Sequence, residues 1–164
     1  MRERALLLAL GTSGVLAMAA CGDASSAAPS SNAAQPAAST GIAASIALHS
    51  TSLGGVLVDA NGLTLYEFDA DKTAASTCYG NCAAVWPPVL TSGAPVASAG
   101  VMAALLGTSA RHDGSVQVTY GGHPLYRFVS DTKPGDTTGE GSTSFGAGWD
   151  VLDARGKVID NGGS

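Results

Sequence analysis

Apolar and polar residues alternate in short stretches that are separated by glycine-containing turns. Val56 and Val58 stand two residues apart before an Asn61-Gly62 pair, and a largely apolar stretch from Leu65 to Phe68 comes after the pair. Alternation with a period of two is typical of a strand with one buried face, and Asn-Gly tolerates the positive φ angles of a tight hairpin turn. The pattern predicts a β-hairpin within residues 54–71.

The same pattern returns sixty residues later, within residues 114–131. The first copy contains Leu65-Tyr66-x-Phe68-x-x-Asp71, and the second contains Leu125-Tyr126-x-Phe128-x-x-Asp131. Many identities at one fixed offset indicate a repeated supersecondary unit. The first-copy residues that recur sixty positions later are Gly54, Val56, Val58, Gly62, Leu65, Tyr66, Phe68 and Asp71.

Further turn signals divide the rest of the chain into equally short pieces. Residues 151–156 repeat part of the hairpin pattern and predict a closing hairpin. Helix is expected only as short turns, chiefly over residues 81–85, because Pro87-Pro88 cannot continue it. Closely spaced strands with glycine turns predict an all-β domain over residues 42–164, with antiparallel sheets built from a duplicated β-hairpin unit.

The first twenty residues have the pattern of a secretory signal peptide. Arg2 and Arg4 precede an apolar run that ends at Ala20, which is too short and wrongly flanked for a transmembrane helix. The segment ends in Met18-Ala19-Ala20-Cys21, which is similar to the lipobox of bacterial lipoproteins. We expect Cys21 to be the acylated N-terminus of the mature protein. The alternative is ordinary cleavage after Ala17-Met18-Ala19, which would leave Cys21 a free thiol.

Residues 21–41 differ sharply in composition from the predicted β domain. Beyond Cys21 they are almost wholly Ala, Ser, Pro, Asn and Gln, with one charge and no aromatic residue. Such a segment buries too little apolar surface to offset its chain entropy, so we expect a disordered tether. Two or more acyl chains on Cys21 would hold the protein stably at a membrane of the cell envelope, on the extracytoplasmic side.

The acidic balance of the chain excludes one class of partner. Eight Lys and Arg residues stand against 13 Asp and Glu residues, which gives a net charge of -5. Removal of the first twenty residues takes away two arginines and one glutamate, which makes the balance more acidic. A phosphate backbone would be repelled, so we expect no nucleic-acid partner.

Cys78 and Cys82 are the cysteines that remain once Cys21 is acylated. Outside the cytoplasm such a pair normally forms a disulfide, and one helical turn places the two Cα atoms at a bridgeable distance. We expect a structural disulfide and no bound metal. A soft metal such as Cu(I) and a redox-active dithiol remain as alternatives. The side chains available as further metal ligands are His49, His112, His123 and Met102.

The repeated motif places Tyr and Phe two residues apart, on one face of a strand. Tyr66 with Phe68, and Tyr126 with Phe128, are therefore expected to pack in a core, with each tyrosine hydroxyl reaching a polar partner. The alternative is an exposed aromatic platform for a ligand.

Asp71 and Asp131 come after the two strands at the same distance. An Asp at such a position most often accepts hydrogen bonds from backbone amides of the next turn, and the alternative is contact with a ligand or an ion. The loop over residues 131–141 is rich in oxygen atoms, but its spacing does not match a helix-loop-helix calcium site.

The combination of these motifs resembles the bacterial secreted-repeat lipoproteins that carry a Tyr-x-(Phe/Trp/Tyr)-x-x-Asp motif and have no known molecular function. The resemblance covers about residues 50–156, nearly all of the mature domain. It rests on both motif copies, on Thr77-Cys78-x-x-x-Cys82-Ala83-x-x-Trp86-Pro87-Pro88 and on Pro134-Gly135-Asp136-Thr137. It implies an envelope lipoprotein and lends no catalytic residue.

The sequence carries no nucleophile elbow, phosphate-binding loop, dinucleotide fingerprint or zinc-protease motif. We therefore expect a lipid-anchored envelope lipoprotein with a non-catalytic binding or interaction role and no cofactor. Its partner would be an envelope protein or a small molecule. The alternative is a metal-handling or electron-transfer accessory protein that uses Cys78 and Cys82.

Overall fold

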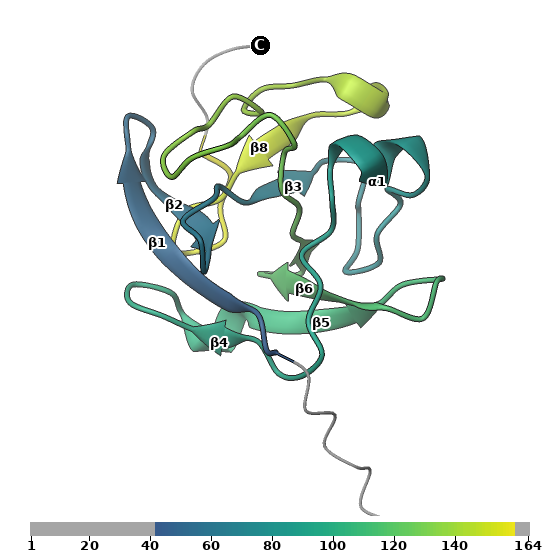
Figure 1. The fold of residues 1–164 in the computed structure, drawn as a ribbon, viewed down its shortest axis with the longest axis horizontal. Coiled ribbons are helices and arrows are strands. Elements are labelled where there is room, and N and C mark those ends of the chain that lie inside the picture. The colour runs from purple at the N-terminus through teal and green to yellow at the C-terminus, as the bar shows by residue number, and fades with distance from the viewer. Residues whose placement is uncertain (1–41, 160–164) are drawn as a thin grey trace, which may run out of the picture. The chain divides into compact units, whose positions relative to one another are not determined.

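Short strands and turns make up the domain in the computed structural model, which describes residues 42–159 (Figure 1). The predicted signal peptide, the predicted lipidation site at Cys21 and the predicted tether up to residue 41 lie outside these residues. The strands are β1 (Ser45–Thr51), β2 (Gly54–Asp59), β3 (Tyr66–Phe68), β4 (Val96–Ala97), β5 (Leu106–Ala110), β6 (Val116–Tyr120), β7 (His123–Pro124) and β8 (Trp149–Val151). The helical pieces are α1 (Asn81–Val85) and the 3-10 turns η1 (Ala103–Leu105) and η2 (Ser144–Gly146).

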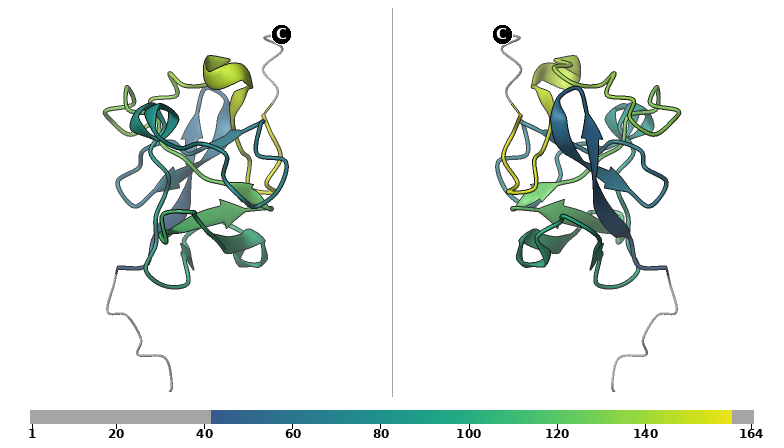
Figure 2. Two further views of the ribbon diagram at one scale, coloured as in Figure 1. Left: turned by 90° about the vertical axis from the view of Figure 1, so that its right-hand side faces the viewer. Right: turned by 90° about the vertical axis from the view of Figure 1, so that its left-hand side faces the viewer.

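The described strands form three small sheets, which confirms the predicted all-β class. Their orders are β2-β1-β4, β3-β8 and β5-β6-β7. Neighbouring strands are antiparallel except β1 and β4, which pair in parallel. In the views of Figures 1 and 2, η2 lies at one end of the domain, whereas β4 and β5 lie at the other.

The tight turns fall where glycine was expected to allow them. After β2, the Gly62 N–H donates to the Asp59 carbonyl oxygen, and Gly62 has a φ of 79°. The second copy turns at Gly121 and Gly122 between β6 and β7. These two turns come directly before the two motif copies and place them at equivalent positions.

Beyond the turns, the return strands depart from simple hairpins. His123 and Pro124 pair with β6, and the Leu125 N–H donates to the Val118 carbonyl oxygen at 3.0 Å, although the sequence pattern predicts a return strand up to Phe128. The reason is that Tyr66 and Tyr126 pair with each other: each backbone N–H donates to the other residue's carbonyl oxygen at 2.9 Å. The two copies are therefore joined through the main chain at the middle of their motifs.

Alternating side chains of the motif strands enter two separate clusters. Leu65 and Leu125 pack in an aliphatic core with residues such as Leu57, whereas Tyr66 and Tyr126 pack in an aromatic core. The aromatic core consists of Val56, Val58, Tyr66, Phe68, Cys78, Cys82, Trp86, Tyr126, Trp149 and Val151. The period of two thus places successive motif residues on opposite faces, as a strand requires.

Candidate functional site

The tyrosine of each motif bonds to the aspartate of the other copy. The Tyr66 hydroxyl donates to Asp131 Oδ2 at 2.5 Å, and the Tyr126 hydroxyl donates to Asp71 Oδ2. The two tyrosines are fully buried and the two aspartates are 5% exposed. The tyrosine of each copy is therefore bonded to the aspartate of the other copy. The Tyr-to-Asp spacing, which the two copies share, allows both of these contacts to form.

The second oxygen of each carboxylate is held by a threonine. Asp71 Oδ1 accepts the backbone N–H of Thr77 at 2.7 Å and its hydroxyl at 2.6 Å. Asp131 Oδ1 accepts the same two groups of Thr138, at 3.0 and 2.5 Å. Both carboxylates are thus surrounded by donors, which offsets the cost of burying their charge.

Burial raises the pKa of Tyr66 and Tyr126 well above the ordinary tyrosine range. The hydrogen bond to Asp131 raises the pKa of Tyr66 further, and the bond to Asp71 does the same for Tyr126. A hydroxyl that donates to a carboxylate loses that bond when it ionises. Both tyrosines therefore act as hydrogen-bond donors at neutral pH.

Four aromatic rings of the two copies form one continuous stack. Trp86 and Trp149 lie face to face, with ring centroids 3.9 Å apart and an interplanar angle of 4°. Phe68 stacks on the outer face of Trp149 at 4.1 Å, and Phe128 stacks on the outer face of Trp86 at 4.4 Å. Phe68 thus packs in the core, as predicted, and the partly buried Phe128 packs against it, at the two ends of a stack that crosses between the copies.

Gly139 lets the loop of residues 131–141 close over this stack. A Cβ atom at this position would come within 2.7 Å of Trp86 and 3.0 Å of Tyr66. The Gly139 N–H also donates to the Tyr66 hydroxyl at 3.3 Å. Within the same loop, Asp136 Oδ2 accepts the backbone N–H groups of Thr132 and Lys133.

The 3-10 turn η2 is fastened to the two tryptophans. The Trp149 indole N–H donates to the Ser144 carbonyl oxygen at 2.8 Å, and the Trp86 indole N–H donates to Ser144 Oγ at 3.1 Å. The next residue, Phe145, has a φ of 64° and is 48% exposed. A large side chain rarely adopts this left-handed backbone, because its Cβ crowds the following carbonyl.

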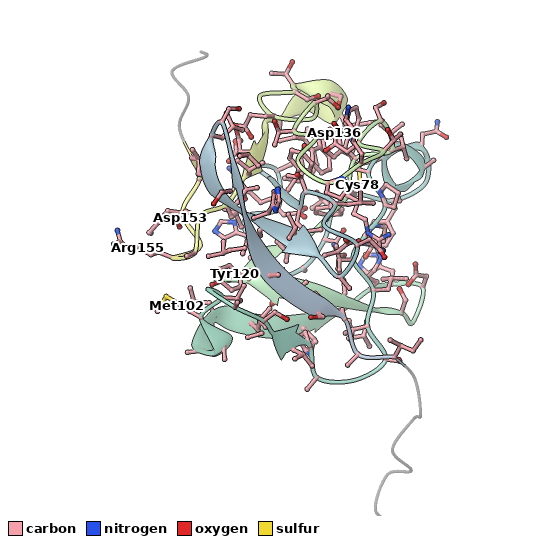
Figure 3. All side chains as sticks on the ribbon, turned by 60° about the vertical axis from the view of Figure 1, so that its left-hand side comes forward. Cys78, Met102, Tyr120, Asp136, Asp153 and Arg155 are labelled. Carbon is pink, nitrogen blue, oxygen red and sulfur yellow. A yellow bond between two sulfur atoms is a disulfide. The ribbon has the colours of Figure 1, made fainter. Side chains whose placement is uncertain are left out.

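Cys78 and Cys82 lie at disulfide distance, with their Cα atoms 5.3 Å apart. Both are buried in the aromatic core, and Cys82 is on α1, whose bounds are those predicted. The backbone N–H of Trp86 donates to the Cys82 carbonyl oxygen at 2.7 Å. The cysteine pair is thereby coupled to the position of one tryptophan of the stack, and Figure 3 shows Cys78 at the same end of the domain as Asp136.

A buried arginine that the sequence did not single out lies beside this pair. Arg111 donates to Ser76 Oγ at 2.9 Å, to the Gln117 side-chain oxygen at 2.6 Å and to the Cys78 carbonyl oxygen at 2.8 Å. Ser76 Oγ also lies 2.7 Å from the Tyr126 hydroxyl oxygen. No local motif marks Arg111, because its partners come from distant parts of the chain. The network joins the two parts of the duplicated chain, and the first copy has Leu57 where the second has Gln117, so the copies do not contribute equivalent residues to it.

The middle residue of each motif reaches across on the opposite face. Glu67 Oε2 lies 2.6 Å from His123 Nδ1, and Arg127 Nε lies 3.4 Å from Asp59 Oδ2. Burial raises the pKa of the Glu67 carboxyl, the nearby His123 opposes this, and Asp150 adds to it. Two more side-chain pairs thus connect the copies.

The side chains considered as metal ligands are placed apart from one another. His112 stacks on Tyr79 at 5.0 Å, and His123 contacts Glu67. His49 is exposed on β1. Among residues 42–159, no three His, Cys, Asp or Glu side chains are gathered as a metal site would need.

The family model described as a secreted repeat of unknown function matches this chain twice, at residues 47–90 and 107–153. The two matches together cover more than half of the chain. The chain belongs to this secreted-repeat family. No match was found among curated proteins or among solved structures.

Each secreted repeat contains one motif and one tryptophan of the stack, so the reciprocal contacts run between the two matched segments. The first match holds Tyr66, Asp71 and Trp86, and the second holds Tyr126, Asp131 and Trp149. A secreted family places the protein outside the cytoplasm. Within the part of the chain that the structure describes, no helix is long and apolar enough to cross a membrane.

The domain has an uncharged surface groove of about 780 Å³. It lies between the segment after Val89, the middle of β5 and the turn before β6. Small and hydroxyl-bearing residues make up most of its lining, with two larger apolar side chains. The lining residues are Leu90, Thr91, Ser92, Gly93, Ala94, Thr108, Gly114, Ser115 and Val116.

Proposed function

We propose that the protein is a lipid-anchored, extracytoplasmic module that binds a partner without catalysis, through the η2 turn and its exposed Phe145. The observation that carries this proposal is the conformation of Phe145, an exposed aromatic residue in left-handed backbone. Backbone strain of this kind costs about 1–2 kcal/mol and is found where function requires it.

The surroundings of Phe145 hold it as a preorganised contact. Ser144 accepts the indole N–H groups of both Trp86 and Trp149, which are fully buried. The turn is thus fixed to two fully buried side chains of the aromatic core. An exposed aromatic side chain on a rigid support binds with a small loss of conformational entropy, which is the usual character of an interface hot spot.

The motif residues support a scaffold role more than a chemical one. Tyr66, Asp71, Tyr126 and Asp131 use their polar atoms on one another and on Thr77 and Thr138. Binding residues on a rigid scaffold are most often carried by its loops, and η2 is a loop element joined directly to this one.

A photo-crosslinking amino acid at position 145 tests the binding role. A benzoylated phenylalanine would replace Phe145, or Val158 as a control of similar exposure (43%), in cells that retain their envelope. We expect a discrete higher-mass adduct from position 145 and none from position 158. Equal labelling at both positions, or no adduct at position 145, would contradict the proposal.

Phe145→Gly separates binding from stability. Glycine accepts the left-handed backbone without strain but is more flexible when unfolded, so the free energy of unfolding should stay within about 1 kcal/mol of the original. The variant should nevertheless fail to compete for the partner captured at position 145. A variant that competes as well as the original protein would show that Phe145 is not the contact.

The anchor is tested by the mass of the mature N-terminus and by fractionation. We expect Cys21 to carry acyl chains and the protein to sediment with membranes, whereas Cys21→Ser should release it into the soluble fraction. A Cys21→Ser protein that still sediments with membranes would contradict lipid anchoring at this residue. The same mass measurement would show Cys78 and Cys82 as a disulfide.

A further inference from the structure

The end of the domain that contains β4 and β5 is built from segments without charged side chains. No Asp, Glu, Lys or Arg occurs between residues 42 and 58 or between residues 73 and 110. These ranges include β4, η1 and β5, which lie at the end away from η2, and β1, which runs from that end towards the other (Figures 1 and 2). The acidic residues that border these elements include Asp113, in the turn after β5, and Asp153, next to Ala154, whose carbonyl oxygen accepts the Tyr120 hydroxyl.

Aliphatic side chains are exposed on this uncharged end. Leu90 is 46% exposed and Val116 is 38% exposed, and both line the groove. Val96 on β4 is 51% exposed, and Ile42 is 92% exposed. We call the four residues Ile42, Leu90, Val96 and Val116 the apolar rim.

The charged residues next to the groove, Asp113 and Arg111, interact with each other and with neighbouring polar groups. Asp113 precedes the groove residue Gly114, and its carboxylate accepts the backbone N–H and the hydroxyl of Ser115. It also faces Arg111, whose Nε lies 3.7 Å from Asp113 Oδ2. Arg111 itself is 5% exposed.

The chain that leads to the predicted anchor leaves the domain beside the same groove. Ile42 is the first described residue, and its carbonyl oxygen accepts the hydroxyl of Ser92, which lines the groove. The Ala44 N–H donates to Thr91 Oγ1, a second lining residue. Twenty residues separate Ile42 from Cys21, and the chain that carries Cys21 joins the domain at Ile42, on the side of the apolar rim.

We propose that the apolar rim lies on the lipid surface to which Cys21 is anchored, which turns η2 and Phe145 away from the membrane. This inference rests on the lipid anchor of the proposed function. A bilayer with anionic lipids repels carboxylates at short range, so an acidic domain approaches it most closely with a surface whose lining residues carry no charge. The aliphatic side chains of that end then enter the headgroup region.

The contact is weak on its own and depends on the anchor. Four partly exposed aliphatic residues bury little area, and binding of the free domain would be marginal. Attachment through Cys21 makes the contact intramolecular, with an effective concentration in the millimolar range for a short flexible linker. Because the anchor keeps the domain close to the membrane, the lipid surface is always available to contact the apolar rim.

Quenching by brominated lipids in vesicles tests this orientation. Acylated protein would carry Leu90→Cys, labelled with an environment-sensitive fluorophore without reductant, in vesicles of phosphatidylethanolamine and phosphatidylglycerol with brominated acyl chains. Val129→Cys is the matched control, because Val129 is 51% exposed and lies next to Phe128, outside the apolar rim. We expect roughly twofold stronger quenching at position 90 than at position 129, because only the rim reaches the acyl boundary.

The experiment distinguishes a failure of lipid anchoring from a failure of the proposed orientation. Protein that fails to sediment with the vesicles would contradict lipid anchoring itself. Protein that sediments but shows equal quenching at positions 90 and 129 would overturn the orientation alone. Protection of position 90 by a second copy of the chain, seen as a dimer in cross-linking without quenching, would also overturn it.

A charge placed on the apolar rim provides a second test. Val116→Glu adds a carboxylate to the groove edge, and a probe at Val96→Cys reads its effect on the lipid contact. We expect the quenching at position 96 to fall to the level of the control position while the protein still sediments. Val129→Glu adds the same charge outside the rim and should leave quenching at position 96 unchanged. Equal effects of the two glutamates would contradict the proposal.

Discussion

Two hydroxyl groups determine how the repeated motif works. Tyr66 donates to Asp131 and Tyr126 donates to Asp71, so neither motif is satisfied by residues of its own copy. The other oxygen of each carboxylate already accepts from Thr77 or Thr138, so the tyrosine hydroxyl completes the set of donors around it. At the scale of the residue, the two motif copies are joined by two equivalent Tyr-to-Asp hydrogen bonds.

Tyr66→Phe tests the value of one exchanged contact. It leaves Asp131 Oδ2 and the Gly139 N–H without the hydroxyl that joins them, in a buried site. We expect the free energy of unfolding in urea to fall by about 1–3 kcal/mol. Tyr79→Phe is the control, because the Tyr79 hydroxyl accepts the exposed His112 N–H, and its loss should cost less. Equal costs for the two variants would contradict a special role of Tyr66.

The pairing is tested separately by a double-mutant cycle. If Tyr66 and Asp131 act on each other, Tyr66→Phe combined with Asp131→Asn should cost less than the sum of the two single variants. Additive costs would show that the two side chains contribute independently, despite their 2.5 Å contact.

Glu67 makes stability depend on pH. Its pKa is raised by burial, so in the folded state the carboxyl holds its proton more tightly than in the unfolded chain. Stability from this group is fully present below the unfolded pKa near 4.3 and is lost as pH rises through the folded pKa. We expect the stability of the original protein relative to Glu67→Gln to decrease from pH 4 towards neutral pH, as measured by urea unfolding at several pH values.

His123 supplies the control for the Glu67 prediction. The contact with His123 lowers the pKa of Glu67 and so limits the shift that burial produces. His123→Gln should therefore raise that pKa further and extend the loss of stability to higher pH. An unchanged pH dependence in both variants would show that Glu67 does not titrate in a perturbed environment.

At the scale of elements, the sequence predicts turns and short helices correctly, but it does not predict which strands pair. The turn at Gly62, the turn at Gly121-Gly122 and helix α1 arise from backbone preferences within a few residues, and sequence reasoning placed them correctly. In the first copy the return strand reaches Phe68, as the pattern predicts, but its last part, β3, pairs with β8; in the second copy the pairing with β6 ends before Phe128. A hairpin pattern cannot show that Tyr66 and Tyr126 leave their own hairpins to pair with each other, since that pairing depends on tertiary contacts.

Helix α1 has only five residues and depends on its surroundings. Its N-cap residue, Gly80, provides no side-chain cap, and no isolated helix of this length is stable in water. Cys78 and Cys82, at disulfide distance, bracket residues 79–81, where the chain enters the helix. Pinning this turn positions Trp86, whose N–H donates to the Cys82 carbonyl oxygen.

Cys78→Ala/Cys82→Ala tests the contribution of the cysteine pair. Opening so small a ring should lower the free energy of unfolding by about 2 kcal/mol in the chain-entropy model. Because Trp86 is then less firmly held, its fluorescence should shift in the folded state. Reductant should reproduce both effects in the original protein and have none on the double alanine variant. An effect of reductant on that variant would show another cause.

At the scale of the whole molecule, sequence reasoning identified the duplication but not its interlocking. An offset of sixty residues shows that Tyr66 and Tyr126 are equivalent. It does not show whether each tyrosine forms its hydrogen bond within its own copy or to the other copy. The Arg111 network and the exposed Phe145 were missed for the same reason, because neither carries a local pattern. Sequence alone thus reveals the unit, and packing decides how two units combine.

Interlocked copies should unfold together. The main-chain pairs between Tyr66 and Tyr126, the exchanged hydroxyls and the shared stack of Trp86 and Trp149 all break if either copy opens. We expect amides of β2 in the first copy and β6 in the second to exchange hydrogen with the same opening free energy and the same denaturant dependence. Tyr66→Phe lies in the first copy but should lower both values equally, because the contact that it removes holds the second copy as well. If β2 alone lost protection in this variant, the copies would be independent folding units, and the motif would be a local structural signature instead of a link between them.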